Sequence, residues 1–163
     1  MLLGLGMEKV SINSYAFENP SFIKEASDLF GSQSIVVSID VKRTVWGGYE
    51  VYTRGGRKPT GFDPVRYALH MESLGAGEIL ISSIDRDGMM NGYDIELVKR
   101  VTVAVQLPII ACGGAGKIED FGMVVREGGG SAAAAGSMVV YQGKNRAVLI
   151  NFPSKVELKQ VLG

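Results

Sequence analysis

The sequence is short of several residue types and patterns, and each shortage excludes a class of protein. It has one cysteine, Cys112, and one histidine, His70, which excludes an internal disulfide framework and a zinc site of the usual kind. Neither charge sign dominates, because 17 Lys and Arg residues face 17 Asp and Glu residues. This balance argues against a nucleic-acid or membrane-surface binder. No apolar run reaches the ~18–20 residues of a membrane span.

The start of the chain has no basic residues ahead of its apolar ones, so it is not predicted to be a signal peptide. The lone cysteine fits a reducing compartment, and a cytoplasmic location is expected. The sequence contains no GxGxxG and no Walker A motif, so no cofactor and no metal are expected.

Short apolar runs alternate with amphipathic stretches along the chain. Residues 45–61 are predicted to be a long loop, with a small hairpin around Gly47-Gly48. Asp63 is the predicted N-cap of a helix whose first residue is Pro64. Strands are expected over residues 8–13, 34–40, 78–84, 107–112 and 131–137, and helices over 20–30, 63–74, 95–105, 118–127 and 156–162.

This strict alternation predicts a parallel sheet covered by helices. Two α/β folds compete, an open doubly wound sheet and the closed (β/α)₈ barrel. A whole barrel takes ~250 residues, whereas the 163 residues hold about five strand–helix units. The chain is therefore an open sheet or a piece of a barrel, and residues 1–163 are expected to form a single, incomplete domain.

Two glycine-rich segments follow the last two predicted strands. The first is Gly113-Gly114-Ala115-Gly116 and the second is Gly136-Ser137. Glycines there allow backbone N–H groups to approach an anion, and such adjacent loops form the usual phosphate site of a barrel. The alternative is that these glycines only permit tight turns.

Other polar residues also follow predicted strands. Asp87-Gly88 and Asn13-Ser14 are candidates for a second phosphate, unless residues 85–88 are only a solvated turn. Asp40 ends a very apolar strand, where burial raises a carboxyl pKa and suits the group to acid–base chemistry. Asp40 paired structurally with Lys42 or Arg43 is the equal alternative.

At the opposite ends of their strands lie two charged residues, Lys9 and Glu78. Period-two counting places Lys9 on the same face as Asn13, and Glu78 on the same face as Ser82. Inward charges are costly unless they are paired. Lys9 and Glu78 are therefore expected to form a stabilising ion pair in the barrel floor, or to gate a central passage.

Six ordered motifs resemble one family over nearly the whole chain. They are KVSIN, VVSIDVKR, GGRKPTG, LGAGEIL, SxDRDGxxxGYD and GGAGK, and they resemble the cyclase subunit of imidazole glycerol phosphate synthase from its fourth strand to its eighth. The resemblance implies a partial (β/α)₈ barrel, a glutaminase partner docked on the N-terminal face, and ammonia passing through the barrel. It also implies a substrate with two phosphates, a ribulosyl formimino aminoimidazole carboxamide nucleotide of histidine synthesis. The products are imidazole glycerol phosphate and an aminoimidazole carboxamide ribotide.

The resemblance assigns roles by position. Asp40 matches a catalytic aspartate, and Lys9 and Glu78 match two residues of an ammonia gate. One implied phosphate site contains Asn13, Ser14, Ser82, Asp87 and Gly88, and the other contains Gly113, Gly114, Gly136 and Ser137.

The sequence also departs from this family. It has no counterpart of the first three strand–helix units, which carry the second catalytic aspartate. The missing part is expected upstream or on another chain, and the chain alone is expected to be inactive. Ser14 and Ser82 stand where the histidine-pathway enzymes have threonine, and Cys112 where they have serine. These differences, with the ending GKNRAVLINFPS, also resemble a paralogous branch that passes ammonia to an amidotransferase making acetamidino sugars for surface polysaccharide.

Overall fold

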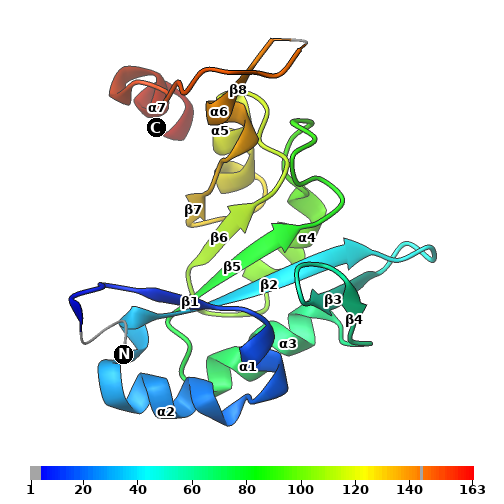
Figure 1. Cartoon of the computed structure of the whole chain (residues 1–163), viewed down its shortest axis with the longest axis vertical. Helices are drawn as coiled ribbons and strands as arrows, with labels where there is room; N and C mark the ends of the chain where they lie inside the picture. The colour runs from blue at the N-terminus through cyan, green and yellow to red at the C-terminus, as the bar shows by residue number, and fades with distance from the viewer. Residues whose placement is uncertain (1–4, 144) are drawn as a thin grey trace.

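The computed structural model describes residues 5–143 and 145–163, and its centre is a parallel β-sheet (Figure 1). Each parallel strand pairs with the next one along the chain, so the strand order never reverses. The parallel strands are β1 (Val10–Ile12), β2 (Ile35–Arg43), β5 (Glu78–Ser83), β6 (Ile109–Cys112) and β7 (Ala132–Ala133).

The helices form a single layer, in which α3 contacts α4, α4 contacts α5, and α5 contacts α7. A doubly wound sheet carries helices on both faces, so this arrangement selects the partial (β/α)₈ barrel. The helices are α1 (Ser14–Glu18), α2 (Ser21–Phe30), the 3₁₀ helix η2 (Ser32–Ser34), α3 (Pro64–Ser73), α4 (Ile95–Thr102), α5 (Glu119–Arg126), α6 (Ser137–Val140) and α7 (Lys155–Leu162).

The two faces of the sheet differ in burial. In β5, Ile79 and Ile81 are buried against the helices, while Glu78, Leu80 and Ser82 are partly exposed on the other face. The same alternation runs through β6 and through β2 from Val37 to Val41, whereas Val36, earlier in β2, is buried at 6% exposure although it lies on the other face. We call the uncovered side the open face; it carries Lys9, Ser11, Asn13, Val36, Ser38, Asp40, Glu78, Leu80, Ser82, Ile110 and Cys112.

An antiparallel extension corrects the loop predicted over residues 45–61. The hairpin turn at Gly47-Gly48 is present, but β3 (Tyr49–Thr53) and β4 (Lys58–Pro59) follow it. β3 pairs with Asp40–Arg43, which prolongs β2 beyond its predicted end at residue 40. β3 lies on the same edge of β2 as β1, which pairs only with Ile35–Val37.

The other predicted helices and strands are present in the structure and differ from the prediction only at their ends. Asp63 caps α3 as predicted, accepting from the backbone nitrogens of Val65 at 2.9 Å and Arg66 at 3.0 Å. The strand predicted over 131–137 is wrong after Ala133, because Ser137 opens a helix. Helices α1 and α6 and the hairpin of β8 (Tyr141–Gln142) and β9 (Ala147–Val148) were not predicted. Among residues 5–143 and 145–163, no helix has the length and apolarity to cross a bilayer.

Candidate phosphate and catalytic site

A row of polar side chains crosses the open face where its parallel strands end. Asp40 is in register with Ser82, and Ser82 is in register with Cys112. Asn13, which follows β1, donates from Nδ2 to the hydroxyl of Ser38 at 3.4 Å. The register of the sheet therefore brings residues from four strands into one line.

Asp40 is the carboxyl group of this row, and its pKa is shifted. Burial raises its pKa above the ordinary value, the nearby charge of Asp87 raises it further, and a hydrogen bond from Asn13 lowers it. Asp40 takes part in none of the ion pairs among the described residues. Arg43 instead contacts Glu96, at 2.9 Å between Nη2 and Oε2. The geometry therefore does not support a structural pair of Asp40 with Lys42 or Arg43, and a carboxyl that retains its proton more readily suits acid–base chemistry.

Next to this row is a small pocket, which we call the glycine pocket. It has a volume of about 100 Å³ and lies where the loops after β5, β6 and β7 meet. Six of the residues predicted to bind phosphate line it. The described residues that line it are Asp87, Gly88, Cys112, Gly113, Gly114, Ala115, Ala134, Ala135, Gly136 and Ser137.

The glycines of this pocket serve two different purposes. Gly113 and Gly114 have φ angles of +87° and +110°, and an added Cβ would lie 2.6 Å and 2.2 Å from backbone oxygens of neighbouring loops. Only glycine fits these two positions. A Cβ on Gly136 would meet nothing within 4 Å, so this glycine leaves open space in the pocket and is not required for packing.

The structure groups the residues predicted to bind phosphate differently from the resemblance. The resemblance placed Asp87 and Gly88 with Asn13 and Ser14, whereas the structure places them with the loops after β6 and β7. Asn13 and Ser14 lie at the end of β1, where the Ser14 hydroxyl donates to Asn13 Oδ1 at 3.1 Å. Ser82 lies in the row beside Asp40 and is in register with Cys112 on the next strand. Asp87 is close enough to Asp40 for its charge to raise the pKa of Asp40, so the glycine pocket and the row are electrostatically connected.

A buried network behind the site was missed by the sequence reasoning. Asp94 is 6% exposed, and its Oδ1 accepts from the Tyr49 hydroxyl at 2.9 Å and from Leu97 N at 3.1 Å. The backbone N–H of Arg43 donates to Asp85 at 2.7 Å. The network therefore joins β2 and its hairpin to the loop after β5. Asp94 directly precedes α4, and this N-cap signal was available in the sequence.

Tyrosines act as donors in and beside this network. Burial and Asp94 raise the pKa of Tyr49, so its hydroxyl remains protonated and donates. Burial likewise raises the pKa of Tyr93, whose hydroxyl donates to the Ala134 carbonyl at 2.9 Å. Because Ala134 lines the glycine pocket, Tyr93 supports one of its walls.

At the N-terminal end of the open face, Lys9 and Glu78 form the predicted ion pair. β2 lies between their strands, so the two side chains meet across it. Their side chains are 47% and 21% exposed.

Cys112 and His70 provide no alternative chemistry. Burial is the main cause that raises the pKa of the Cys112 thiol, followed by the charge of Asp87, so the thiol is a poor nucleophile. His70 is exposed near the end of α3, away from the open face. Over the described residues no cluster of three or more His, Cys, Asp or Glu side chains is arranged to hold a metal.

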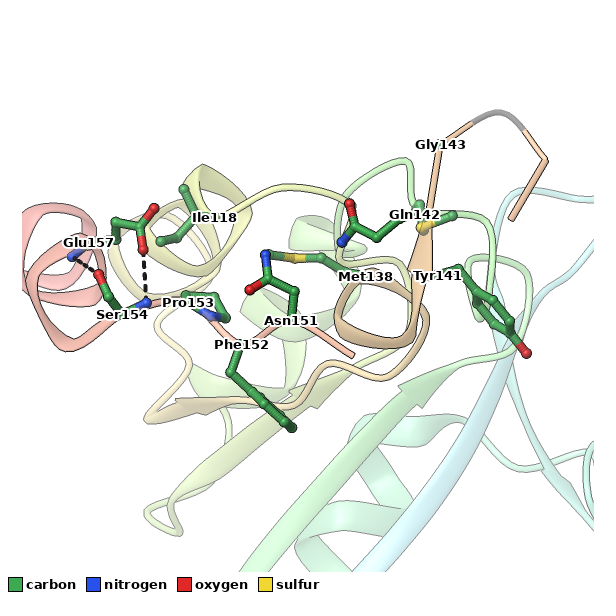
Figure 2. Close-up of a pocket in the computed structure, with 12 residues that line it drawn as sticks. Ile118, Met138, Tyr141, Gln142, Gly143, Asn151, Phe152, Pro153, Ser154 and Glu157 are labelled. Atoms are coloured by element: carbon green, nitrogen blue, oxygen red, sulfur yellow. Dashed lines mark hydrogen bonds between the residues drawn. The ribbon is translucent and has the colours of Figure 1, made fainter. Parts of the chain in front are cut away.

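A second, larger cavity of about 590 Å³ lies between α7, the β8–β9 hairpin and the loops after β5 and β6. Figure 2 shows the side chains of Gln142 and Asn151 directed into this space and Phe152 directed away from it. Of the residues that the sequence predicted to bind an anion, only Gly116, at the end of the first glycine-rich segment, is among its lining residues. The candidate site is therefore the row with Asp40 and the glycine pocket.

A single helical layer, strands in sequential order and a glycine-lined pocket at their carboxyl ends define a partial (β/α)₈ barrel. The family model described as histidine biosynthesis protein matches residues 1–146, and the chain belongs to this family. It is 52% identical over 136 residues to imidazole glycerol phosphate synthase subunit HisF of Alkaliphilus metalliredigens (strain QYMF), covering 83% of this chain and 54% of that protein.

Two further relatives cover almost the whole chain. A putative imidazole glycerol phosphate synthase subunit hisF2 of Pseudomonas aeruginosa is 45% identical over 152 residues, which are 93% of this chain and 61% of that protein. A putative subunit hisF3 of Vibrio vulnificus is 42% identical over 162 residues, which are 99% and 62%. The chain thus spans between 54% and 62% of the length of these relatives.

Proposed function

We propose that residues 1–163 form one incomplete barrel domain of a cyclase subunit of imidazole glycerol phosphate synthase. The observation that carries this proposal is Asp40, a partly buried carboxyl without a cationic partner among the described residues, beside a glycine-lined pocket. In the proposed reaction, ammonia cleaves the two-phosphate ribulosyl nucleotide and closes the imidazole ring. The products are imidazole glycerol phosphate and an aminoimidazole carboxamide ribotide.

Asp40 is the proposed proton carrier in this reaction. Its raised pKa favours a carboxyl group that accepts a proton from the attacking amine and returns it to the leaving group. One substrate phosphate occupies the glycine pocket, and the other lies near Asn13 and Ser14. The two regions flank the row of Asp40 and Ser82, which suits a long substrate with a phosphate at each end.

The proposed partner is a glutaminase that docks at the N-terminal end of the strands and releases ammonia there. The Lys9–Glu78 ion pair lies at this end of the open face. In this proposal the pair is part of the gate that ammonia passes before it reaches Asp40. The remaining gate residues and the second catalytic aspartate belong to strands that this sequence does not contain.

A second candidate function is supported by residues of the site itself. Ser14, Ser82 and Cys112 depart from the histidine-pathway pattern, and the relatives include putative subunits hisF2 and hisF3. In this reading the barrel passes ammonia to an amidotransferase that makes acetamidino sugars. Such a barrel needs the gate and glutaminase docking, but no tight site for the two-phosphate nucleotide.

The test begins with calorimetric titration of the chain with the two-phosphate ribulosyl nucleotide. Saturable binding that Gly136→Asp abolishes is expected for a cyclase. Binding of a glutaminase without binding of the nucleotide would favour the channelling role, and loss of that docking in Lys9→Ala would strengthen it. Binding of neither would overturn both functions.

Turnover is tested on a reconstituted barrel. The chain is combined with the part of Alkaliphilus metalliredigens HisF that precedes the matched region, and product formation is followed with ammonium salts. Growth of a cyclase-deficient bacterium without histidine then distinguishes the histidine pathway from the acetamidino-sugar pathway. A reconstituted barrel that binds the nucleotide but never turns it over would contradict the cyclase proposal.

A further inference from the structure

The β8–β9 hairpin is attached to the wall of the glycine pocket. Ser137 lines the pocket and opens α6, and the chain continues from α6 directly into β8. The segment after the hairpin returns to α6, where Leu149 N donates to Val140 O and Asn151 N donates to Val139 O, each at 2.9 Å. Figure 1 shows the hairpin projecting at the same end of the molecule as the loops after β5 and β6. Its position is therefore fixed relative to the pocket.

Arg146 extends from this hairpin to the pocket. Its guanidinium donates to the carbonyl oxygen of Gly88, and Gly88 is one of the lining residues. The guanidinium carbon also lies 5.6 Å from the centre of the Tyr141 ring, which limits the side chain to one side of the hairpin.

The backbone of Arg146 is unusual as well. Its φ angle is +50°, a left-handed conformation that non-glycine residues seldom adopt. Arg146 N donates to Gly143 O at 3.1 Å and closes the turn. A large side chain is thus held where glycine or asparagine is the usual choice, and outliers of this kind cluster at ligand sites.

The positive charge of Arg146 complements the lining of the glycine pocket. Among the described residues, the glycine pocket is lined by one carboxylate, that of Asp87, and by no lysine or arginine, so no described cationic side chain in its lining offsets the repulsion between Asp87 and a bound phosphate. Arg86 is nearby but already engaged, with Nη1 on the Gly92 carbonyl at 3.1 Å and Nε 3.8 Å from Asp94. Arg146 takes part in none of the ion pairs among residues 5–143 and 145–163.

We propose that Arg146 is a ligand of the phosphate group in the glycine pocket. On binding, its guanidinium leaves the Gly88 carbonyl and donates two hydrogen bonds to the phosphate oxygens, the geometry in which arginine recognises phosphate monoesters. The inference rests on the proposed phosphate site and adds to it a side chain from outside the strand–helix units. It makes the β8–β9 hairpin part of the binding site.

The experiment titrates the chain with inorganic phosphate and with ribulose 5-phosphate, using calorimetry and amide chemical shifts. Arg146→Ala is expected to weaken the affinity for both about 10-fold or more, because a charge-assisted bidentate contact is lost. Arg146→Lys should recover part of it, since lysine restores the charge but not the fork. Arg66→Ala removes an exposed arginine from α3 and is the matched control, expected to bind as the unaltered chain does.

The outcomes separate this inference from the proposed function. If Gly136→Asp abolishes phosphate binding while Arg146→Ala binds with unaltered affinity, the role of Arg146 is wrong and the pocket stands. If the unaltered chain binds neither probe, the phosphate site itself is wrong and the inference falls with it. Equal losses in Arg146→Ala and Arg66→Ala would reduce the effect to net charge and also overturn the specific contact. Thermal unfolding of each variant verifies that the fold is retained.

Discussion

The two ends of the open face hold charge in opposite ways. At the N-terminal ends of the strands, Lys9 and Glu78 neutralise each other in an ion pair. At the C-terminal ends, Asp40 faces Asn13 and the like charge of Asp87, and burial raises its pKa. The first end is electrostatically satisfied and the second is not. A carboxyl held in this way costs stability and is available to a ligand, so the comparison supports the proposed site at the C-terminal ends of the strands.

The largest expected effect comes from Asp40→Asn, which removes the proton carrier from the unsatisfied end. Ammonia-dependent turnover of the reconstituted barrel should fall by about 10²–10⁴-fold, the usual range for loss of a general acid or base. The affinity for the two-phosphate nucleotide should be retained. Asp28→Asn, on the exposed i,i+4 pair with Lys24, is the control, and equal turnover in both variants would remove Asp40 from the mechanism.

Substitutions of Gly136 separate the pocket from the fold. Gly136→Ala has free space for its methyl group, so its free energy of unfolding should change by no more than about 0.5 kcal/mol. Gly136→Asp adds a second carboxylate to a pocket that already holds Asp87 and should weaken phosphate binding at least about 10-fold. Titration with inorganic phosphate measures this, and undiminished affinity in Gly136→Asp would show that phosphate binds elsewhere.

Gly114 is unsuitable for the same test. A Cβ there would lie 2.2 Å from the Gly92 carbonyl, so a loss of binding in a Gly114 variant would report damage to the fold.

The Lys9–Glu78 pair should contribute modestly to stability. A double-mutant cycle with Lys9→Met and Glu78→Gln is expected to give a coupling free energy of about 0.5 kcal/mol, because both side chains reach water. The more exposed Lys24–Asp28 pair is the reference and should give about 0.3 kcal/mol. Urea unfolding at low and high salt measures both. A coupling near zero would mean that Lys9 and Glu78 do not stabilise each other. The electrostatic contrast between the two ends of the open face would then be wrong.

The smallest expected effect is the pH dependence caused by Asp40. A carboxyl whose pKa is raised on folding contributes no penalty below its unfolded pKa, and the penalty grows as pH rises through the folded pKa. Asp40→Asn should therefore stabilise the chain at pH 7 and lose this advantage as the pH falls below the ordinary aspartate pKa of about 4. Because Asp40 is only partly buried, the gain is expected to be small. Thermal unfolding across this pH range measures it, and a variant less stable than the parent at pH 7 would contradict the raised pKa.

Periodicity and local signals predicted much of the fold. The order of five parallel strands and their helices is confirmed, because buried β-branched runs and amphipathic stretches have separate periods. The cap at Asp63 is confirmed because one residue and its neighbours determine it. The shared face of Asn13, Asp40 and Ser82 follows from period-two counting and the parallel register.

Other features depend on contacts distant in sequence. The extension of β2 requires its pairing with β3, and the small residues of 131–137 do not reveal that Ser137 begins a helix. Asp87 lines the glycine pocket because the loops after β5, β6 and β7 meet there. No single segment of the sequence indicates this meeting. The bond from Arg146 to Gly88 spans 58 positions and could be found only in the folded chain.

The network around Asp94 also sets a rule for recombining this barrel with its relatives. Asp94 belongs to the segment after β5, but its donor Tyr49 belongs to the hairpin after β2, and Arg43 is tied in turn to Asp85. A chimaera that takes only one of the two segments from another parent combines the buried acceptor at position 94 with a donor segment from a different protein. The hydrogen bond between the two segments can then be lost. Crossover points should therefore be chosen outside residues 43–97, so that both segments are exchanged as one module.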